Sequence, residues 1–140
     1  MKESDINHLE FVQSIINRMS NNSFLLKSWT VTISSAILAL SIGVPKSPFS
    51  IIALFSSLAF WGLDAYYLRQ ERLFRCLYDE IRRSHFSKNN DKIEPFSLET
   101  DKCDSQVSGW FRTLWSKSVI GLHGVVLAVV IITISILFAY

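Results

Sequence analysis

The chain has 140 residues, enough for one small domain, and a formal net charge of +2, too small by itself to indicate a polyanionic partner. Its apolar fraction of 49% and charged fraction of 19% are near enough to soluble averages that composition alone excludes no class. The distribution is more informative, because Ser118 to Tyr140 contains no Lys, Arg, Asp or Glu. We therefore predict an all-α membrane protein with three transmembrane helices.

Residues 1–23 predict an N-terminal amphipathic helix. Within residues 4–19, apolar side chains recur at three- and four-residue spacing. This helix could lie on a membrane surface, pack against another helix of the chain, or sit beneath a pore. Asn-Asn-Ser at 21–23 predicts a break or a cap before the next segment. The apolar positions are Ile6, Leu9, Val12, Ile16 and Met19.

Residues 24–67 predict a transmembrane hairpin. Its two apolar stretches, 24–44 and 49–67, are each about as long as a helix that crosses the ~30 Å hydrocarbon core. Pro45 and Pro48 lie between them and favour a short turn. The alternative interpretation is a soluble helical core.

Each arm of the hairpin carries one charged residue. Lys27 lies near the start of the first arm and Asp64 near the end of the second, so an antiparallel hairpin places both at the same membrane edge. We predict that they form an ion pair, or share a polar cluster with Arg69. Alternatively, each side chain reaches toward water independently.

Residues 68–106 predict a cytoplasmic extension of the second helix followed by a polar loop. Residues 49–85 contain no internal helix breaker except Gly62, and one helix of that length would extend roughly 55 Å, beyond the hydrocarbon core. Acid–base pairs at i, i+4 spacing, Glu71–Arg75 and Asp79–Arg83, support the extension. Residues 86–106 are polar and predict a flexible loop.

Arginine and aromatic side chains are interspersed along this extension. That combination suits phosphate contacts and base stacking. Residues 64–85, however, hold five arginines against four acids, so a solvated face of salt bridges is the alternative interpretation. Repeated around an oligomer, the same face could still form a positive concavity. The candidate phosphate contacts are Arg72, Arg75, Arg82 and Arg83.

Residues 107–140 predict an interfacial segment and a C-terminal transmembrane helix. The sequence GWFRTLW at 109–115 combines aromatic residues with Arg112, as expected at a membrane–water interface. His123 lies inside the predicted span. It could line a pore or relay protons, or it could form a hydrogen bond between helices.

The distribution of basic residues predicts the orientation. Thirteen of the fourteen Lys and Arg residues lie before the hairpin turn or between the second and third spans. The positive-inside rule then places the N-terminus and residues 68–117 in the cytoplasm and the C-terminus on the opposite side. Cys76 and Cys103 would both be in the reducing compartment, so we predict ordinary thiols, not a disulfide or zinc site.

Known catalytic and cofactor-binding motifs are absent from the sequence. It contains no P-loop, nucleophile elbow, H-E-x-x-H zinc motif or glycine-rich dinucleotide turn. We therefore predict a protein that is not an enzyme and has no cofactor or metal.

Two blocks, NSFLLKSWTVT at 22–32 and FWGLDAYYLRQERLFRCLYD at 60–79, resemble the channel effectors of the bacterial Hailong antiphage system. The resemblance covers the first two predicted spans and the extension, about half of the chain, and includes the pattern LDAYYLRxER. It assigns no role to individual residues. The matching positions are Lys27, Trp29, Asp64, Tyr66, Tyr67, Arg69, Glu71, Arg72 and Arg75.

This resemblance implies a homo-oligomeric channel, a tetramer, in the bacterial inner membrane. It implies that a single-stranded oligodeoxyadenylate, made by a partner nucleotidyltransferase, holds the channel closed. Opening would then depolarise the cell as an abortive antiphage defence. Two other functions fit the sequence: a non-conducting membrane adaptor that docks a cytoplasmic protein, and an unregulated membrane-disrupting toxin.

Overall fold

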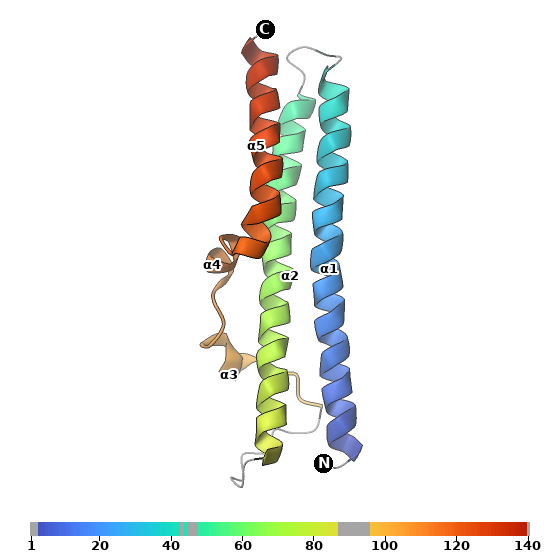
Figure 1. Ribbon diagram of the computed structural model, residues 1–140, viewed down its shortest axis with the longest axis vertical. Helices are drawn as coiled ribbons and strands as arrows, with labels where there is room; N and C mark the ends of the chain where they lie inside the picture. Colours follow the sequence, from blue (N-terminus) through green and yellow to red (C-terminus); the bar gives the residue numbers. More distant parts are fainter. Residues whose placement is uncertain (1–2, 43, 45–47, 87–95, 140) are drawn as a thin grey trace.

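The computed structural model describes residues 3–42, 44, 48–86 and 96–139. Two long antiparallel helices lie side by side, and a third runs along one half of the pair (Figure 1). Residues 45–47 of the predicted turn and 87–95 of the predicted polar loop lie outside the described residues. The helices in chain order are α1 (Glu3–Ile42), α2 (Phe49–Phe86), α3 (Asp101–Asp104), α4 (Trp110–Leu114) and α5 (Lys117–Ala139).

Three of these helices, α1, α2 and α5, are long and apolar enough to cross a membrane. Helix α5 has 23 residues and a length of about 34 Å, close to the thickness of a hydrocarbon core. Helices α1 and α2 have 40 and 38 residues, so each is nearly twice as long as a bilayer requires. The described structure thus matches the predicted all-helical class with three span-length helices.

The third helix lies beside only one half of the long pair. In Figure 1, α5 runs next to the C-terminal half of α1 and the N-terminal half of α2. The N-terminal half of α1 and the C-terminal half of α2 project beyond it. A bilayer crossed by α5 would therefore leave these two halves outside the hydrocarbon core.

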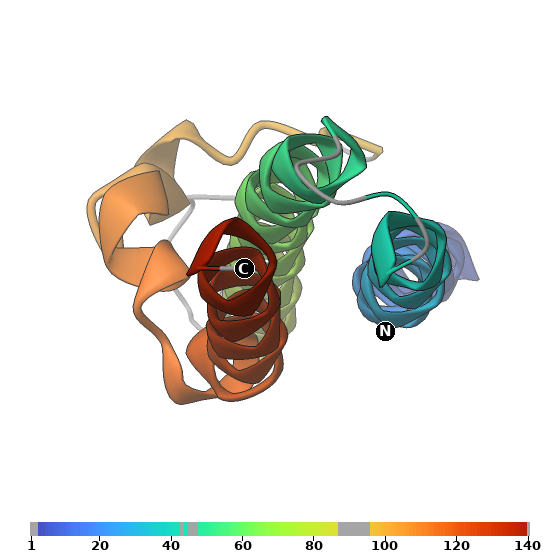
Figure 2. The same cartoon turned by 90° about the horizontal axis from the view of Figure 1, so that it is seen from above.

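Seen along the bundle, the three long helices are not in one row. Figure 2 shows α2 and α5 close together, α1 to one side, and the short helices α3 and α4 on the side away from α1. Helix α2 thus contacts every other helix of the fold, which makes it the central element.

The predicted break or cap at residues 21–23 is wrong, because α1 is one continuous helix. Asn21, Asn22 and Ser23 lie within it, and the amphipathic segment is the first half of the long helix, not a separate element. Asn is only a moderately poor helix former, and packing along a partner of nearly equal length outweighs this preference.

The first half of α1 is held by a hydrophobic core at the projecting end of the bundle. Its apolar residues pack against α2, as the second of the three predicted alternatives requires. Met19 is half-buried and Ile6 is 43% exposed, so the predicted apolar face is fully buried only at its middle positions. The buried members of this core are Leu9, Val12, Ile16, Leu73, Leu77, Ile81 and Cys103.

Replacing Asn21 with proline tests the continuity of α1. Asn21 is exposed and in mid-helix, so Asn21→Pro removes a backbone hydrogen bond and introduces a steric clash. We expect the free energy of unfolding in detergent to fall by about 3 kcal/mol, measured by thermal or denaturant unfolding. Asn21→Ala is the matched control and should be neutral or slightly stabilising. Equal stability of the two variants would indicate a break at this position.

The described part of the connecting segment between α2 and α5, residues 96–116, includes α3 and α4 and is tied to α2 at several points. Trp61 donates a hydrogen bond through Nε1 to the Leu114 carbonyl oxygen at 3.1 Å, and Trp110 donates one to the Gly62 carbonyl oxygen at 3.1 Å. Trp115 packs edge-on against Trp61. These contacts set the height at which α5 begins.

The prediction of ordinary thiols is wrong, because Cys76 of α2 and Cys103 of α3 form a disulfide. Their Cα atoms are 5.9 Å apart, within the range typical of disulfides. The prediction relied on the expected redox compartment and could not include the packing of α3 on α2, which brings residues 27 positions apart together.

Candidate functional site

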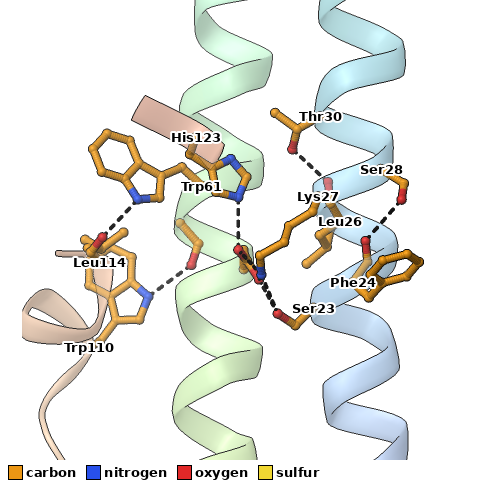
Figure 3. Close-up of polar contacts among 12 residues, drawn as sticks. Ser23, Phe24, Leu26, Lys27, Ser28, Thr30, Trp61, Trp110, Leu114 and His123 are labelled. Atoms are coloured by element: carbon orange, nitrogen blue, oxygen red, sulfur yellow. Dashed lines mark hydrogen bonds and ion pairs between the residues drawn. The ribbon is translucent and has the colours of Figure 1, made fainter. Parts of the chain in front are cut away.

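A buried polar cluster joins all three long helices. We call Ser23, Lys27, Asp64 and His123 the Asp64 cluster. Figure 3 shows Ser23 and Lys27 from α1 and His123 from α5 directed toward a carboxylate on α2. The Asp64 side chain is fully buried, and His123 is 1% exposed. The cluster lies where α5 packs against the long pair.

Asp64 accepts hydrogen bonds on both carboxylate oxygens. Lys27 Nζ lies 2.8 Å from Oδ1 and 2.7 Å from Oδ2. Ser23 Oγ donates to Oδ1 at 2.5 Å, and His123 Nε2 lies 3.0 Å from Oδ2. Lys27 also donates to Ser23 Oγ at 2.8 Å, one helical turn away on α1. The carboxylate and the ammonium therefore neutralise each other among polar partners.

The predicted Lys27–Asp64 ion pair is confirmed, but Arg69 is not part of the cluster. Arg69 forms an ion pair with Asp104 of α3. Arg69 is five positions after Asp64, which places it about 140° further around α2 at about 100° per residue. Arg69 therefore faces the connecting segment, not α1.

The third partner of Asp64 is His123, not Arg69 as predicted. The contact joins α5 to α2, so His123 forms a hydrogen bond between helices, which was one of the roles predicted for it. Its Nδ1 atom is buried and has no hydrogen-bond partner among the described residues. Ser23 was missed because Asn-Asn-Ser was interpreted as a helix break. Its position four residues before Lys27 was the signal that could have placed it on the same face of α1.

A second feature, on the projecting half of α2, is the set of four predicted phosphate contacts. Arg72, Arg75, Arg82 and Arg83, here called the arginine face, fall within an arc of about 100° around the helix. The buried Leu77 lies on the opposite side, in the core with α1. The arginine face is thus directed away from α1.

Among the described residues, two of these arginines are paired with acids and two are not. Arg75 binds Glu71 at 2.8 Å, as predicted, whereas Asp79 pairs with Arg82 at 3.3 Å instead of with Arg83. The side chains of Arg75 and Arg82 are 61% and 57% exposed. Within the described part of the chain, Arg72 and Arg83 have no ion-pair partner. The alternative interpretation, a solvated face of salt bridges, therefore holds for two of the four arginines.

A groove of about 550 Å³ separates α1 from α5 on the side of the cluster toward the C-terminus of the chain. Apolar side chains dominate its walls, so it offers few groups that would hold a file of water or ions within one chain. Its lining residues are Val31, Ser34, Ser35, Leu38, Gly121, Leu122, Val125, Val126, Val129 and Val130.

Among the described residues, one group has the composition of a metal site. Ligand atoms of Cys76, Glu80 and Cys103 lie within 4.8 Å of one another. The two sulfur atoms are bonded to each other, however, and a disulfide does not supply the thiolates that zinc requires.

Comparison with known proteins gives no further guide. No protein-family model matches the chain, and neither the curated proteins nor the solved structures include a significant match to it.

Proposed function

We propose that this chain is the subunit of a homo-oligomeric channel, a tetramer, in the bacterial inner membrane, with its N-terminus in the cytoplasm and its C-terminus in the periplasm. A single-stranded oligodeoxyadenylate bound in the cytoplasm holds the channel closed. Loss of the ligand opens it and depolarises the membrane as an antiphage defence. The nature of the ligand and of the defence comes from the resemblance of residues 22–32 and 60–79 to the Hailong channel effectors.

The observation that carries the proposal is the arginine face on the part of α2 that projects beyond α5. It is directed away from the core with α1, and it retains two arginines without an acidic partner among the described residues. Guanidinium groups bind phosphate oxygens in a bidentate manner. A phosphate backbone could replace the exposed pair of Arg82 with Asp79, because such pairs contribute little to stability.

Assembly of several copies is required for conduction. Three helices are too few to enclose a wide pore, and the groove within one chain is apolar. A ring of subunits around one axis would enclose a path and bring several arginine faces together. The combined positive potential would attract an oligonucleotide more strongly than one helix could.

The Asp64 cluster could couple ligand binding on α2 to the packing of the membrane-spanning helices. Arg72 and Asp64 are eight residues apart on one helix, about 12 Å along its axis. Because Asp64 binds residues of both α1 and α5, a shift of α2 would move all three long helices together. Ligand binding on the arginine face could therefore change how subunits pack in the membrane.

Recordings from planar bilayers with purified protein test this function. We expect discrete conductance steps that an oligodeoxyadenylate suppresses in a concentration-dependent manner. A membrane adaptor would show no conductance, and a membrane-disrupting toxin would leak in a graded way that the oligonucleotide does not change. Either result would refute the channel. Size-exclusion chromatography with light scattering gives the oligomeric state, and a monomer would also contradict the proposal.

A further inference from the structure

The disulfide between Cys76 and Cys103 conflicts with the orientation proposed above if it is a permanent bond. Disulfides are rare in the cytoplasm, and those that occur there are usually transient and take part in catalysis or redox sensing. We propose that Cys76 and Cys103 are a reversible thiol-modification site that closes under oxidising conditions and then anchors residues 96–107 to α2. This inference rests on the cytoplasmic position of residues 68–117 in the proposed function, but not on conduction.

The bond is the only covalent contact between the described part of this segment and α2. The segment is also held by three polar contacts to α2 or α1 and by the packing of Cys103 and Val107. Arg69 pairs with Asp104, Gln106 Nε2 donates to Glu80 Oε1 at 3.2 Å, and the Ser97 carbonyl oxygen lies 3.0 Å from a ring nitrogen of His8. The Arg69–Asp104 and Gln106–Glu80 contacts are exposed and contribute little, whereas His8 is buried on α1. Reduction would therefore leave the segment held mainly by the packing of Cys103 and Val107 and by the contacts of Phe96 and Ser97 with His8.

Unequal access to the two sulfur atoms fixes the order of the exchange reaction. Cys103 is fully buried, whereas Cys76 is partly exposed. In the oxidation direction, the Cys76 thiolate attacks a small-molecule disulfide such as glutathione disulfide and releases one glutathione thiolate. The Cys103 thiolate then attacks the Cys76 sulfur and displaces the second. Two electrons pass from the protein to glutathione, and the two protons lost by the cysteines are taken up by the two glutathione thiolates.

Glu80 lies beside both sulfur atoms, with its carboxylate within 4.8 Å of them. A negative charge at this place repels an incoming thiolate and opposes the formation of thiolates on the protein. The carboxylate should therefore slow reduction of the bond. A disulfide with a purely architectural role would have no need of such a neighbour, so this residue provides a specific kinetic test.

The disulfide lies close to the arginine face on α2. Cys76 and Arg69 both lie on the side of α2 that faces the connecting segment, next to Arg72. Opening the bond would allow Asp104 to move away from Arg69. One more cation would then be available beside the arginine face.

The test uses the full-length protein in intact cells. Thiols are trapped with acid, alkylated with a maleimide polymer, and separated on a gel before and after brief treatment with diamide. We expect mostly reduced protein in growing cells and mostly closed protein after the oxidant. Cys76→Ser and Cys103→Ser should each abolish the shift. Protein that is fully oxidised in untreated cells, or that diamide does not close, would overturn the proposal.

Reduction kinetics of the purified, oxidised protein test the role of Glu80. At low ionic strength we expect Glu80→Gln to speed reduction by glutathione about fourfold, the effect of one unit charge at 4.8 Å in a water-like dielectric. Glu99→Gln, at an exposed acid of the same segment, is the control and should leave the rate unchanged. Equal rates for the two variants would exclude this electrostatic role.

Two further measurements distinguish the thiol switch from a zinc site and from a periplasmic disulfide. Stoichiometric zinc bound to the reduced protein, and lost in Cys76→Ser, would make the pair a metal site and overturn the redox proposal. Labelling of the reduced cysteines in intact cells by a membrane-impermeant maleimide would place them in the periplasm. That result would refute the orientation as well, whereas a failure of conductance alone would leave the thiol switch standing.

Discussion

Asp64→Asn should lower the free energy of unfolding by about 3 kcal/mol, the lower end of the range for breaking a buried ion pair. The substitution keeps the shape of the side chain but leaves the Lys27 ammonium without its counter-ion. Lys27 is 18% exposed, so part of its charge can still reach polar surroundings, and this limits the cost. Thermal unfolding of the detergent-solubilised protein, followed by size-exclusion chromatography, measures the loss.

A double-mutant cycle separates the ion pair from the rest of the cluster. Lys27→Met together with Asp64→Asn removes both charges, while the Asn carbonyl oxygen can still accept the hydrogen bond from Ser23. The Asn amide nitrogen then takes the place of Oδ2 and can donate to His123 Nε2 in the tautomer that carries its proton on Nδ1. The double variant should therefore be more stable than Asp64→Asn alone, because no uncompensated charge remains. Asp79→Asn is the exposed control and should change stability by less than about 0.5 kcal/mol. Strictly additive effects of the two substitutions would show that Lys27 and Asp64 are not coupled.

Much of the fold follows from patterns that a single segment contains. An uncharged run as long as α5 and the absence of breakers in α2 are local properties, and the structure has the corresponding helices. The Lys27–Asp64 pair is nearly as local, because an antiparallel hairpin with a short turn fixes which residues of its two arms lie opposite each other. These features needed no knowledge of the rest of the chain.

The errors concern choices that depend on packing between distant segments. Asn-Asn-Ser at 21–23 resembles a helix end until α2 is known to continue past it as a partner. His123 was not predicted to contact Asp64, because the height of α5 against α2 is set by contacts of the connecting segment, such as Trp61 with Leu114. No sequence periodicity reports that height.

The wrong prediction for Cys76 and Cys103 has a different cause. The cysteine spacing of 27 residues is compatible with many folds, and the prediction was decided by the compartment instead of by geometry. Compartment rules describe what is common and do not exclude a redox-active pair. The contact of Cys103 with the core of α2 is a tertiary fact that spacing could not supply.

Replacing all four residues of the arginine face with alanine should abolish salt-sensitive binding of an oligodeoxyadenylate. Four phosphate contacts to a single strand predict a slope of about −3 in a plot of log binding constant against log salt concentration. The wild-type protein should therefore lose about 50-fold in affinity between 50 and 200 mM salt. Fluorescence anisotropy with a labelled oligonucleotide measures both the affinity and the slope, and the quadruple variant should show a slope near zero.

The ion pairs on α2 predict that the four arginines do not contribute equally. Arg72 and Arg83 have no acidic partner among the described residues, whereas Arg75 and Arg82 must give up Glu71 and Asp79 to bind a phosphate. Arg72→Ala with Arg83→Ala should therefore cost more affinity than Arg75→Ala with Arg82→Ala, although each double variant removes two positive charges. Equal losses in both variants would mean that only net charge matters. Unchanged binding after all four substitutions, or binding by the wild type that salt does not weaken, would refute the arginine face as the ligand site.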